Sequence, residues 1–289
     1  MDEIVKIKVS DEYFNIEDTL CCGQVFRFAR YKDGYMVRSS DKSAYCHGAD
    51  GITIVECAAG DEEYFRNYFD LNRDYSEIFH AAEQSGYEIL KTSARLGKGI
   101  RILNQDRAEA LFSFVISQNN NIPRIKSIIE RICASLGEER EFFGDKFYAF
   151  PTAESFAGKD AEFYAGLGLG YRAEYISRLA REMADGFSLD EIAVMPTSQL
   201  RERLIRIRGV GPKVADCAVL FGFHRSDSFP VDTWIEKVYS ENFGGTLKDR
   251  KKISERFVGE FGENAGYFQQ YLFYYKRSLE KTLNSDNRR

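Results

Sequence analysis

The sequence predicts an α+β protein in which a small antiparallel sheet is followed by a mostly helical region. Two Asp-Gly turns separate short strand patterns before residue 60, and helical periodicity dominates after a Gly-Lys-Gly break at 97–99. The chain has 289 residues, of which 44% are hydrophobic and 29% charged, so it can bury one large core or two ordinary ones. We therefore expect an N-terminal α/β domain at 1–98 and a helical domain at 99–289.

The first part of the chain has the pattern of β-hairpins. Strands are expected at 24–31, 35–40, 44–47 and 52–57. Asp33-Gly34 and Asp50-Gly51 lie between them, and Asp-Gly is a preferred pair for tight hairpin turns. From Asp61 the spacing becomes helical, with aromatic side chains on one face.

After residue 99 we expect nearly all of the chain to be helical. The segment 107–118 is apolar almost all round, as a central buried helix is. A stripe of isoleucines follows from Ile122 to Ile132, and Asn121 can cap that helix. Further helices are expected at 173–185, 198–207, 213–223, 233–242, 250–261 and 265–280.

The formal net charge of −5 argues mildly against a nucleic-acid partner, but the charge is unevenly spread. Residues 1–98 hold 12 Lys+Arg and 18 Asp+Glu, whereas residues 99–289 hold 28 and 27. The short stretch 201–213 carries five basic residues against one acidic residue. Because a partner responds to the local field, this basic stretch keeps a DNA-binding function open.

The six cysteines include no C-x-x-C pair, and the three histidines lie far apart in sequence, so the sequence indicates no metal site and no cofactor. No apolar run approaches the roughly 18 residues that cross a membrane. The start of the chain lacks a signal pattern, and the free thiols fit a reducing compartment. We expect a cytoplasmic protein with no membrane partner.

The most informative stretch is a helical hairpin at 204–223 that turns at Gly209-Val210-Gly211. The glycines permit a turn with positive φ and leave backbone N–H groups uncovered. Together with the start of the second helix, those groups can hold a phosphate. An ordinary turn between two helices is the plain alternative.

Lys213 stands two residues past that turn, in the first turn of the second helix. The helix dipole disfavours a cation there, and burial would lower its pKa further. A lysine with a lowered pKa can attack carbon as a neutral amine. The alternative is a lysine that stays protonated and binds phosphate, and this motif alone does not separate the two.

Nineteen residues after the lysine, Asp232 lies where a loop enters a helix, after Phe229-Pro230-Val231. This arrangement resembles the Gly/Pro…Asp signature of the helix-hairpin-helix DNA glycosylases, known as the HhH-GPD superfamily. The plain alternative is that Asp232 only caps the helix. We expect Thr233 and Glu236 to form a capping box of their own, which lowers the need for that role.

Four more segments resemble one branch of that superfamily, the 8-oxoguanine DNA glycosylase/AP lyases. They are GQVFR at 23–27, SQNNNIPR at 117–124, LGLGYRA at 167–173 and AGYFQQYLF at 265–273. The matches keep the family order, so the resemblance covers nearly the whole chain. It implies a mostly helical HhH-GPD glycosylase domain behind the N-terminal sheet.

The resemblance implies that Lys213 is the nucleophile at the sugar C1′ and that Asp232 supports charge on the sugar. It further implies a pocket for the extruded base, formed by four residues: Gly23, Cys217, Gln269 and Phe273. Cys217 and Phe273 would sandwich the base, and Gln269 would bind its Watson–Crick edge. Gly23 would offer its carbonyl to the N7–H of the lesion. Without the resemblance, Phe273 and Cys217 would be ordinary core residues.

The resemblance also implies residues that read the opposite strand. Asn119, Arg124 and Arg172 would bind the cytosine left behind, and Tyr171 would wedge into the gap. Arginine suits a base edge because its donors are paired. Plain alternatives are a helix cap for the asparagines and solvated surface arginines. One departure is Trp234, where eukaryotic members carry a histidine near a phosphate.

The expected partner is duplex DNA with 8-oxoguanine opposite cytosine, bound by a monomer at the nucleoid of a prokaryote. The expected reaction is release of 8-oxoguanine followed by β-elimination at the abasic site. Endonuclease III-like and adenine glycosylases usually hold an iron–sulfur cluster with four C-terminal cysteines, and this chain has no cysteine after 217. An alkylated-base glycosylase would need Asp232 but not Lys213. A non-catalytic helix-hairpin-helix DNA-binding module is the alternative from another class.

Overall fold

The computed structural model describes residues 3–286, and their side chains as far as residue 279. The N-terminal elements are β1 (Ile4–Ser10), α1 (Ile16–Cys21), β2 (Phe28–Tyr31), β3 (Gly34–Ser39), β4 (Lys42–Ala49), β5 (Ile52–Ala58), α2 (Glu62–Tyr68), α3 (Tyr75–Glu83) and α4 (Glu88–Leu96). Short 3₁₀ turns lie at Asp11–Tyr13, Ala59–Asp61 and Gly262–Asn264.

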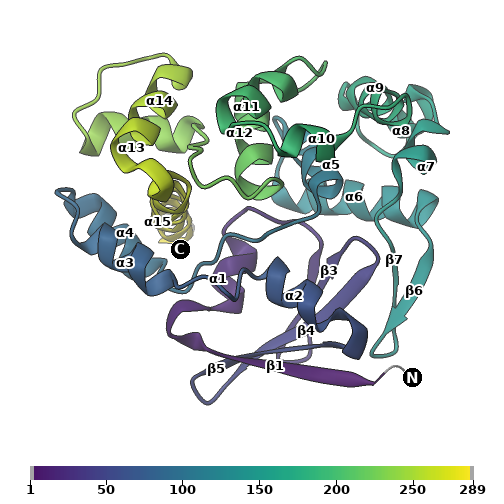
Figure 1. Ribbon diagram of the computed structural model, residues 1–289, viewed down its shortest axis with the longest axis horizontal. Helices are drawn as coiled ribbons and strands as arrows, with labels where there is room; N and C mark the ends of the chain where they lie inside the picture. The colour runs from purple at the N-terminus through teal and green to yellow at the C-terminus, as the bar shows by residue number, and fades with distance from the viewer. Residues whose placement is uncertain (1–2, 287–289) are drawn as a thin grey trace.

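The later elements are α5 (Arg107–Ser117), α6 (Ile122–Leu136), β6 (Glu139–Phe142), β7 (Asp145–Tyr148), α7 (Ala153–Ala157), α8 (Ala161–Gly166), α9 (Arg172–Ala184), α10 (Leu189–Ala193), α11 (Thr197–Ile205), α12 (Pro212–Phe221), α13 (Thr233–Asn242), α14 (Arg250–Phe261) and α15 (Ala265–Asp286). The expected α+β fold is confirmed, with the sheet at one end and helices at the other (Figure 1).

The five-stranded sheet has the order β1-β5-β4-β3-β2, and every pair is antiparallel. The β4–β5 turn is Asp50-Gly51, whose φ angles of 50° and 79° fit a type I′ turn, as the Asp-Gly pair predicts. The β2–β3 turn falls one residue earlier than expected, at Lys32-Asp33, because Tyr31 pairs with Gly34. The sheet therefore confirms the predicted hairpins and adds β1 at its edge.

The expectation that nearly all of the chain after residue 99 is helical is wrong at one place, the β6–β7 hairpin. Its turn, Phe143-Gly144, has φ angles of 54° and 75°. Phe142 and Phe147 are buried with Met36 and Tyr45 of the main sheet, and Arg38 donates to Asp145 at 2.7 Å. The hairpin forms because the outer face of the sheet needs an apolar cover.

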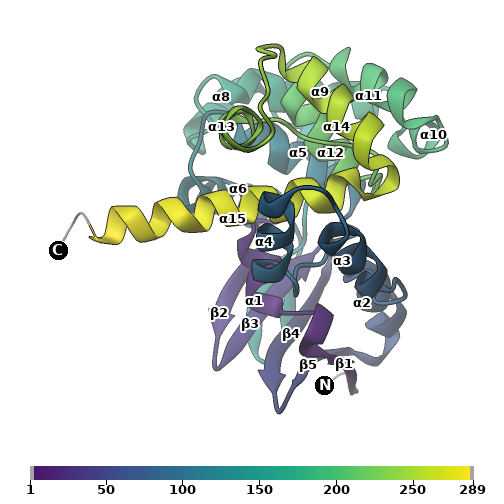
Figure 2. The same ribbon diagram turned by 90° about the vertical axis from the view of Figure 1, so that its left-hand side faces the viewer.

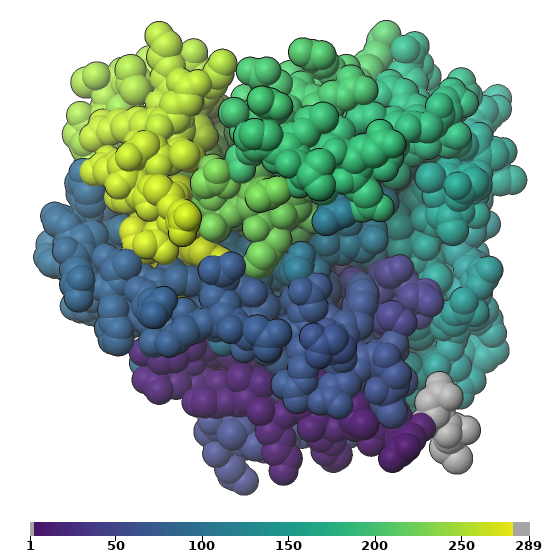
Figure 3. All heavy atoms as spheres, viewed as in Figure 1, coloured from purple at the N-terminus to yellow at the C-terminus, as the bar shows by residue number. Residues whose placement is uncertain are grey.

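Besides the small cluster at the β6–β7 hairpin, the described residues form two larger hydrophobic cores. Phe14, Phe65 and Phe69 belong to the core between α2 and the sheet. Tyr75 and Leu90, from α3 and α4, belong instead to the core of the later helices. In Figure 3 the segment that contains α2–α4 forms a band between the strands and the C-terminal helices. The proposed division of the chain at residue 98 stays a prediction.

The long C-terminal helix α15 passes between the sheet with α1–α4 on one side and the later helices on the other, and its far end extends beyond the body (Figure 2). Its first turns are buried, as Phe268, Tyr271 and Leu272 show. This path brings α15 beside the loop that follows α1, although the two segments lie near opposite ends of the sequence. None of the helices within residues 3–286 is long and apolar enough to cross a lipid bilayer.

Candidate active site

The turn before α12 is fixed by one of its two glycines. Gly209 has φ +93°, and a Cβ there would lie 2.4 Å from Cγ of Tyr175, so only glycine fits. Gly211 has φ −82° and open space around it. It precedes Pro212, a residue suited to the first position of a helix. This turn places Lys213 in the first turn of α12.

The amides of the hairpin are not all available for a phosphate. The N–H of Val210, one of the three residues expected to contact a phosphate, donates to the carbonyl of Ile207 at 3.0 Å. Among the described residues no hydrogen bond uses the N–H of Gly209 or Gly211. Together with the amides in the first turn of α12, these two N–H groups can donate hydrogen bonds to a bound anion.

The amine of Lys213 faces a half-enclosed space, with its Nζ 5.8 Å from the centroid of the Phe114 ring. Cys217, one turn further along α12, and Asp232 raise the pKa of Lys213 above its usual value and outweigh the effect of burial. The expected lowering of this pKa is therefore wrong. Burial lowers the pKa of Lys213 as expected, but the neighbours that the fold places around the amine raise it by more. Burial raises the pKa of the Cys217 thiol to about 11, so its negative charge, and with it its effect on Lys213, exists only at high pH. At pH 7 the main negatively charged neighbour of Lys213 is Asp232.

Asp232 is the N-cap of α13, and the expected capping box of Thr233 and Glu236 does not form. Its Oδ1 accepts from the amides of Trp234 at 2.9 Å and Ile235 at 3.0 Å. No hydrogen bond among the described residues engages its other oxygen. Burial raises the pKa of the Asp232 carboxyl, while the Ile235 amide and Lys213 act in the opposite direction. The cap holds the carboxylate still beside the amine.

A cavity of about 390 Å³ brings together three of the predicted residues, Gly23, Lys213 and Phe273. Trp234 and Arg277 also line it. Its lining comes from the α1–β2 loop, α5, the α5–α6 loop, α6, α12, α13 and α15, so the site exists only in the folded chain. Within residues 3–286, no group of three or more His, Cys, Asp or Glu side chains is placed to hold a metal ion.

Two predicted pocket residues lie in the wall behind that lining. Cys217 is 3% exposed and Gln269 is 4% exposed. The Nε2 of Gln269 donates to the carbonyl of Pro230 at 3.1 Å, whereas its Oε1 is buried without a hydrogen-bond partner. A buried acceptor without a donor is unfavourable by about 1–3 kcal/mol, so Oε1 is suited to a ligand that brings an N–H.

The loop that carries Gly23 is held by a residue that sequence reasoning missed as a support. Gly23 has φ +97°, a conformation that favours glycine. The buried side chain of Gln24 donates from Nε2 to the carbonyls of Arg101 at 2.7 Å and Thr19 at 2.9 Å. Its Oε1 accepts from the N–H of Leu103 at 2.8 Å. The only signal in the sequence was a polar residue between glycine and an aromatic run.

The residues expected to read the opposite strand lie together in two neighbouring segments, the α5–α6 loop with the start of α6 and the α8–α9 loop with the start of α9. Tyr171 is 52% exposed, and its hydroxyl accepts from the Nδ2 of Asn119 at 3.3 Å. Arg124 donates to the carbonyl of Gly168 at 3.1 Å. Arg172 is buried, with Nε on the carbonyl of Gln118 at 2.7 Å and Nη2 on that of Asn119 at 2.9 Å. The Arg172 guanidinium therefore holds the Asn119 loop in this state.

Gln118 joins that loop to the hairpin and was also missed. Its side-chain Nε2 donates to the carbonyl of Gly209 at 2.9 Å. Its own carbonyl accepts from Arg172 and, at 3.3 Å, from the hydroxyl of Tyr171. Its only signal in the sequence is the motif SQNNN, where glutamine precedes the asparagines.

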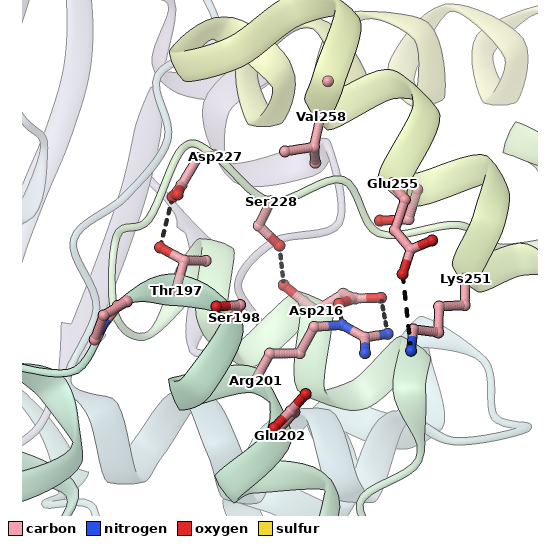
Figure 4. A pocket seen from close by; sticks show the side chains of 13 residues that line it. Thr197, Ser198, Arg201, Glu202, Asp216, Asp227, Ser228, Lys251, Glu255 and Val258 are labelled. Atoms are coloured by element: carbon pink, nitrogen blue, oxygen red, sulfur yellow. Dashed lines mark hydrogen bonds and ion pairs between the residues drawn. The ribbon is translucent and has the colours of Figure 1, made fainter.

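A second hollow, of about 540 Å³, lies on the other side of α12, between α11 and α14 (Figure 4). Four of its charged side chains are paired with one another. The pairs are Arg201 with Asp216 and Lys251 with Glu255. Asp216 precedes Cys217 on α12, so the Arg201 pair fixes the rotation of the helix that carries Lys213.

The comparisons with known proteins agree with this geometry. Residues 6–111 match the 8-oxoguanine DNA glycosylase N-terminal domain, and residues 112–263 match the HhH-GPD superfamily of base excision DNA repair proteins. A probable N-glycosylase/DNA lyase of Methanothermobacter thermautotrophicus is 31% identical over 229 residues, which cover 72% of each chain.

Two further relatives extend the comparison. The N-glycosylase/DNA lyase of Saccharomyces cerevisiae is 35% identical over 208 residues, and the chain spans about half, 54%, of its length. The crystal structure of Clostridium acetobutylicum 8-oxoguanine glycosylase/lyase in complex with dsDNA containing cytosine opposite to 8-oxoguanine has a TM-score of 0.89 and 33% identity, covering 97% of this chain and 100% of that one. The chain belongs to the 8-oxoguanine DNA glycosylase family of the HhH-GPD superfamily.

Proposed function

We propose that the chain is a bifunctional DNA N-glycosylase and abasic-site lyase that removes 8-oxoguanine from duplex DNA, with Lys213 as its nucleophile. The main support for the proposal is that Gly23, Lys213 and Phe273 line one cavity. A base that leaves the stack can enter this space, while the sugar stays near the amine.

Selection of the lesion follows from the acceptors in this pocket. Guanine N7 is an acceptor, whereas N7 of 8-oxoguanine carries a hydrogen, so the carbonyl of Gly23 meets a donor only in the lesion. The normal base would leave that carbonyl without a hydrogen bond, which would make its binding less favourable by about 1–3 kcal/mol. The unpartnered Oε1 of Gln269 suits the N–H donors on the Watson–Crick edge of guanine. Cys217 and Phe273 cover the two faces of the ring.

In the first step the Lys213 amine, after losing its proton, attacks C1′ of the sugar. The bond between C1′ and N9 breaks, and its electron pair leaves with the base, which takes up a proton. Asp232 stabilises positive charge on the sugar and holds the amine in place; its Oδ1 is fixed by two amides, so no reorganisation is needed. The attached nitrogen then gives up a proton and O4′ takes one up. The bond between C1′ and O4′ breaks, the sugar ring opens, and a protonated Schiff base forms between Nζ and C1′.

The Schiff base makes the second step possible. It withdraws electrons from C2′, so a proton leaves C2′ and the bond from C3′ to the 3′ phosphate oxygen breaks. The strand is cut by β-elimination, and water releases Lys213 by hydrolysing the Schiff base. These steps use only side chains of this chain and water.

The opposite strand is read by Asn119, Arg124 and Arg172 in this proposal, with Tyr171 filling the gap left by the extruded base. The exposure of Tyr171 supports a wedge. Arg172 can reach a base only if it releases the carbonyls of Gln118 and Asn119, so DNA binding would rearrange that loop. The amides of Gly209 and Gly211, with the start of α12, would hold a backbone phosphate, and Val210 would supply buried packing.

The proposed partner is duplex DNA with cytosine opposite 8-oxoguanine, bound by one copy of the chain. We infer that the protein works in the cytoplasm, on the chromosome at the nucleoid. Neither the glycosylase step nor the lyase step, as proposed, requires a cofactor.

Borohydride trapping on a duplex with one 8-oxoguanine opposite cytosine tests the proposal. A Schiff base is reduced to a stable covalent adduct, so the protein should become attached to the DNA strand, and the unreduced reaction should release free 8-oxoguanine and a nicked strand. A non-catalytic helix-hairpin-helix module would bind the same duplex and give none of these products.

A further inference from the structure

We propose that three residues on one face of α15, Gln270, Tyr274 and Arg277, are positioning residues that set lesion discrimination by aiming the Gly23 carbonyl. The inference rests on the proposed function, since it assumes that Gly23 reads the lesion. It adds residues to which the family resemblance assigned no role.

The spacing 270, 274 and 277 puts the three side chains on one face of a helix. Each makes a hydrogen bond to the segment just before Gly23. Gln270 donates from Nε2 to the carbonyl of Cys22 at 3.1 Å, and Arg277 donates from Nη1 to the carbonyl of Cys21 at 3.2 Å. The hydroxyl of Tyr274 donates to Oδ1 of Asp18 at 2.5 Å. One helix face therefore holds α1 and its C-terminal loop at three successive points.

The neighbouring stripe of the same helix faces the base. Gln269 and Phe273, four residues apart, are the proposed contacts to its edge and its face. Because the two stripes belong to one rigid helix, the base-binding side chains and the Gly23 carbonyl are held in one frame. A shift of the loop against α15 would change the distance between the carbonyl and N7 without moving the other contacts.

Of the three side chains, that of Arg277 lies nearest to the base cavity. It lines the base cavity, and its Nη1 lies 3.1 Å from the place where a Cβ of residue 23 would be. Its Nη1 donates to the Cys21 carbonyl, and no carboxylate of residues 3–279 lies within 4.0 Å of its guanidinium. A guanidinium carries five N–H donors, so further donors are available to the loop.

Gly23 can distinguish 8-oxoguanine from guanine only if its carbonyl is accurately oriented toward N7 of the base. A binding constellation works when its groups are held within about 0.5 Å of the productive geometry. The loop residues Cys21 and Cys22 end α1, where carbonyl groups lack helical partners. Without Gln270 and Arg277 these carbonyls would turn toward water, and the Gly23 carbonyl would turn with them.

The test compares Arg277→Met with the matched control Lys276→Met. Lys276 is the adjacent cation of the same helix turn, but it pairs with Glu241 at 2.7 Å and does not touch the loop. Two single-turnover rates are measured: release of 8-oxoguanine opposite cytosine, and borohydride trapping on an abasic duplex, which has no base for Gly23 to read.

We expect Arg277→Met to slow 8-oxoguanine release by about tenfold, the effect of losing a charged hydrogen bond, and to leave abasic trapping unchanged. Lys276→Met should match the parent in both assays. Arg277→Lys should recover most of the rate, because an ammonium can still donate to the Cys21 carbonyl. Tyr274→Phe, which removes one hydroxyl and little volume, should slow release with abasic trapping intact.

The inference is overturned if Arg277→Met releases 8-oxoguanine at the parent rate, or if both rates fall by the same factor. The second result would mean that the substitution damages the whole site rather than the reading of the lesion. These outcomes are distinct from failure of the proposed function, in which the parent protein itself neither releases 8-oxoguanine nor becomes trapped on abasic DNA.

Discussion

The side-chain amide of Gln118 donates to the backbone carbonyl of Gly209 at 2.9 Å, and this bond joins the asparagine loop to the hairpin. The Gln118 carbonyl in turn accepts from Arg172. Three segments that resemble separate DNA-contacting motifs therefore share one hydrogen-bonded residue. A displacement of the hairpin should therefore also displace the loop that would face the opposite strand.

Gly209→Ala should displace the hairpin, because the new Cβ would meet the Tyr175 ring and the backbone has a positive φ. Strain of this kind costs of order 1–3 kcal/mol. Gly211→Ala is the matched substitution, since its φ is ordinary and no atom lies within 4 Å of the new Cβ. We expect Gly209→Ala alone to lower the midpoint of thermal unfolding and weaken DNA binding. Equal behaviour of the two variants would contradict the strain argument.

The pH dependence of Schiff-base formation should reflect the raised pKa of Lys213. With that pKa above its usual value, the neutral amine is scarce at pH 7, and its fraction rises about tenfold per pH unit. Trapping on abasic DNA should therefore accelerate between about pH 6 and pH 9. Single-turnover trapping rates in a pH series at constant ionic strength measure this.

Asp232→Asn gives the control for this prediction. Removing the negative charge takes away one of the causes that raise the Lys213 pKa, so the residual activity should rise at lower pH than in the parent. The overall rate should be lower, because charge on the sugar loses its support. A profile that is flat in the parent, or unshifted in Asp232→Asn, would show that the amine does not titrate as described.

The opposite base should control the rate. We expect 8-oxoguanine opposite cytosine to be processed about ten- to a hundredfold faster than opposite adenine, from a mismatch penalty of roughly 1–3 kcal/mol. Asn119, Arg124 and Arg172 are the groups that would impose it. Arg124→Met should narrow the difference without changing abasic trapping. Equal single-turnover rates on all four pairings would show that these residues do not read the base.

DNA affinity should depend only weakly on salt. Hairpin amides release few counterions, and only the nearby Lys and Arg side chains contribute strongly, at about 0.9 per neutralised phosphate. The acidic region 1–98 adds repulsion that salt relieves. We predict a slope on the order of −2 to −5 in log K against log salt, measured by fluorescence anisotropy. A slope near −10 would mean that many more cations touch the backbone.

Local patterns in the sequence predicted most of the fold, and the exceptions have a physical cause. The expected ranges 233–242 and 250–261 agree with the bounds of α13 and α14, because capping residues and apolar spacing are local signals. The β6–β7 hairpin has strands of only four residues each, and its turn begins with Phe143 at positive φ, an uncommon choice. Its stability comes from Met36 and Tyr45, about a hundred residues earlier, which no local window contains.

The site shows the same limit more sharply. Sequence motifs identified residues around the cavity. They did not predict the direction of the Lys213 pKa shift, because that shift depends on Cys217 and Asp232 as neighbours in space. The three glutamines Gln24, Gln118 and Gln270 were missed as supports for a related reason. Their partners lie about 80, 90 and 250 residues away along the chain. Hydrogen bonds of that separation leave no periodicity to find.

The assignment of Lys213 as nucleophile is tested most directly by borohydride trapping of Lys213→Gln on abasic and 8-oxoguanine duplexes. The substitution keeps a polar side chain of similar length at the start of α12 but removes the amine. The account predicts no covalent adduct with either duplex, while binding to lesion DNA, followed by fluorescence anisotropy, stays close to that of the parent. Trapping at the parent rate would show that another amine forms the Schiff base.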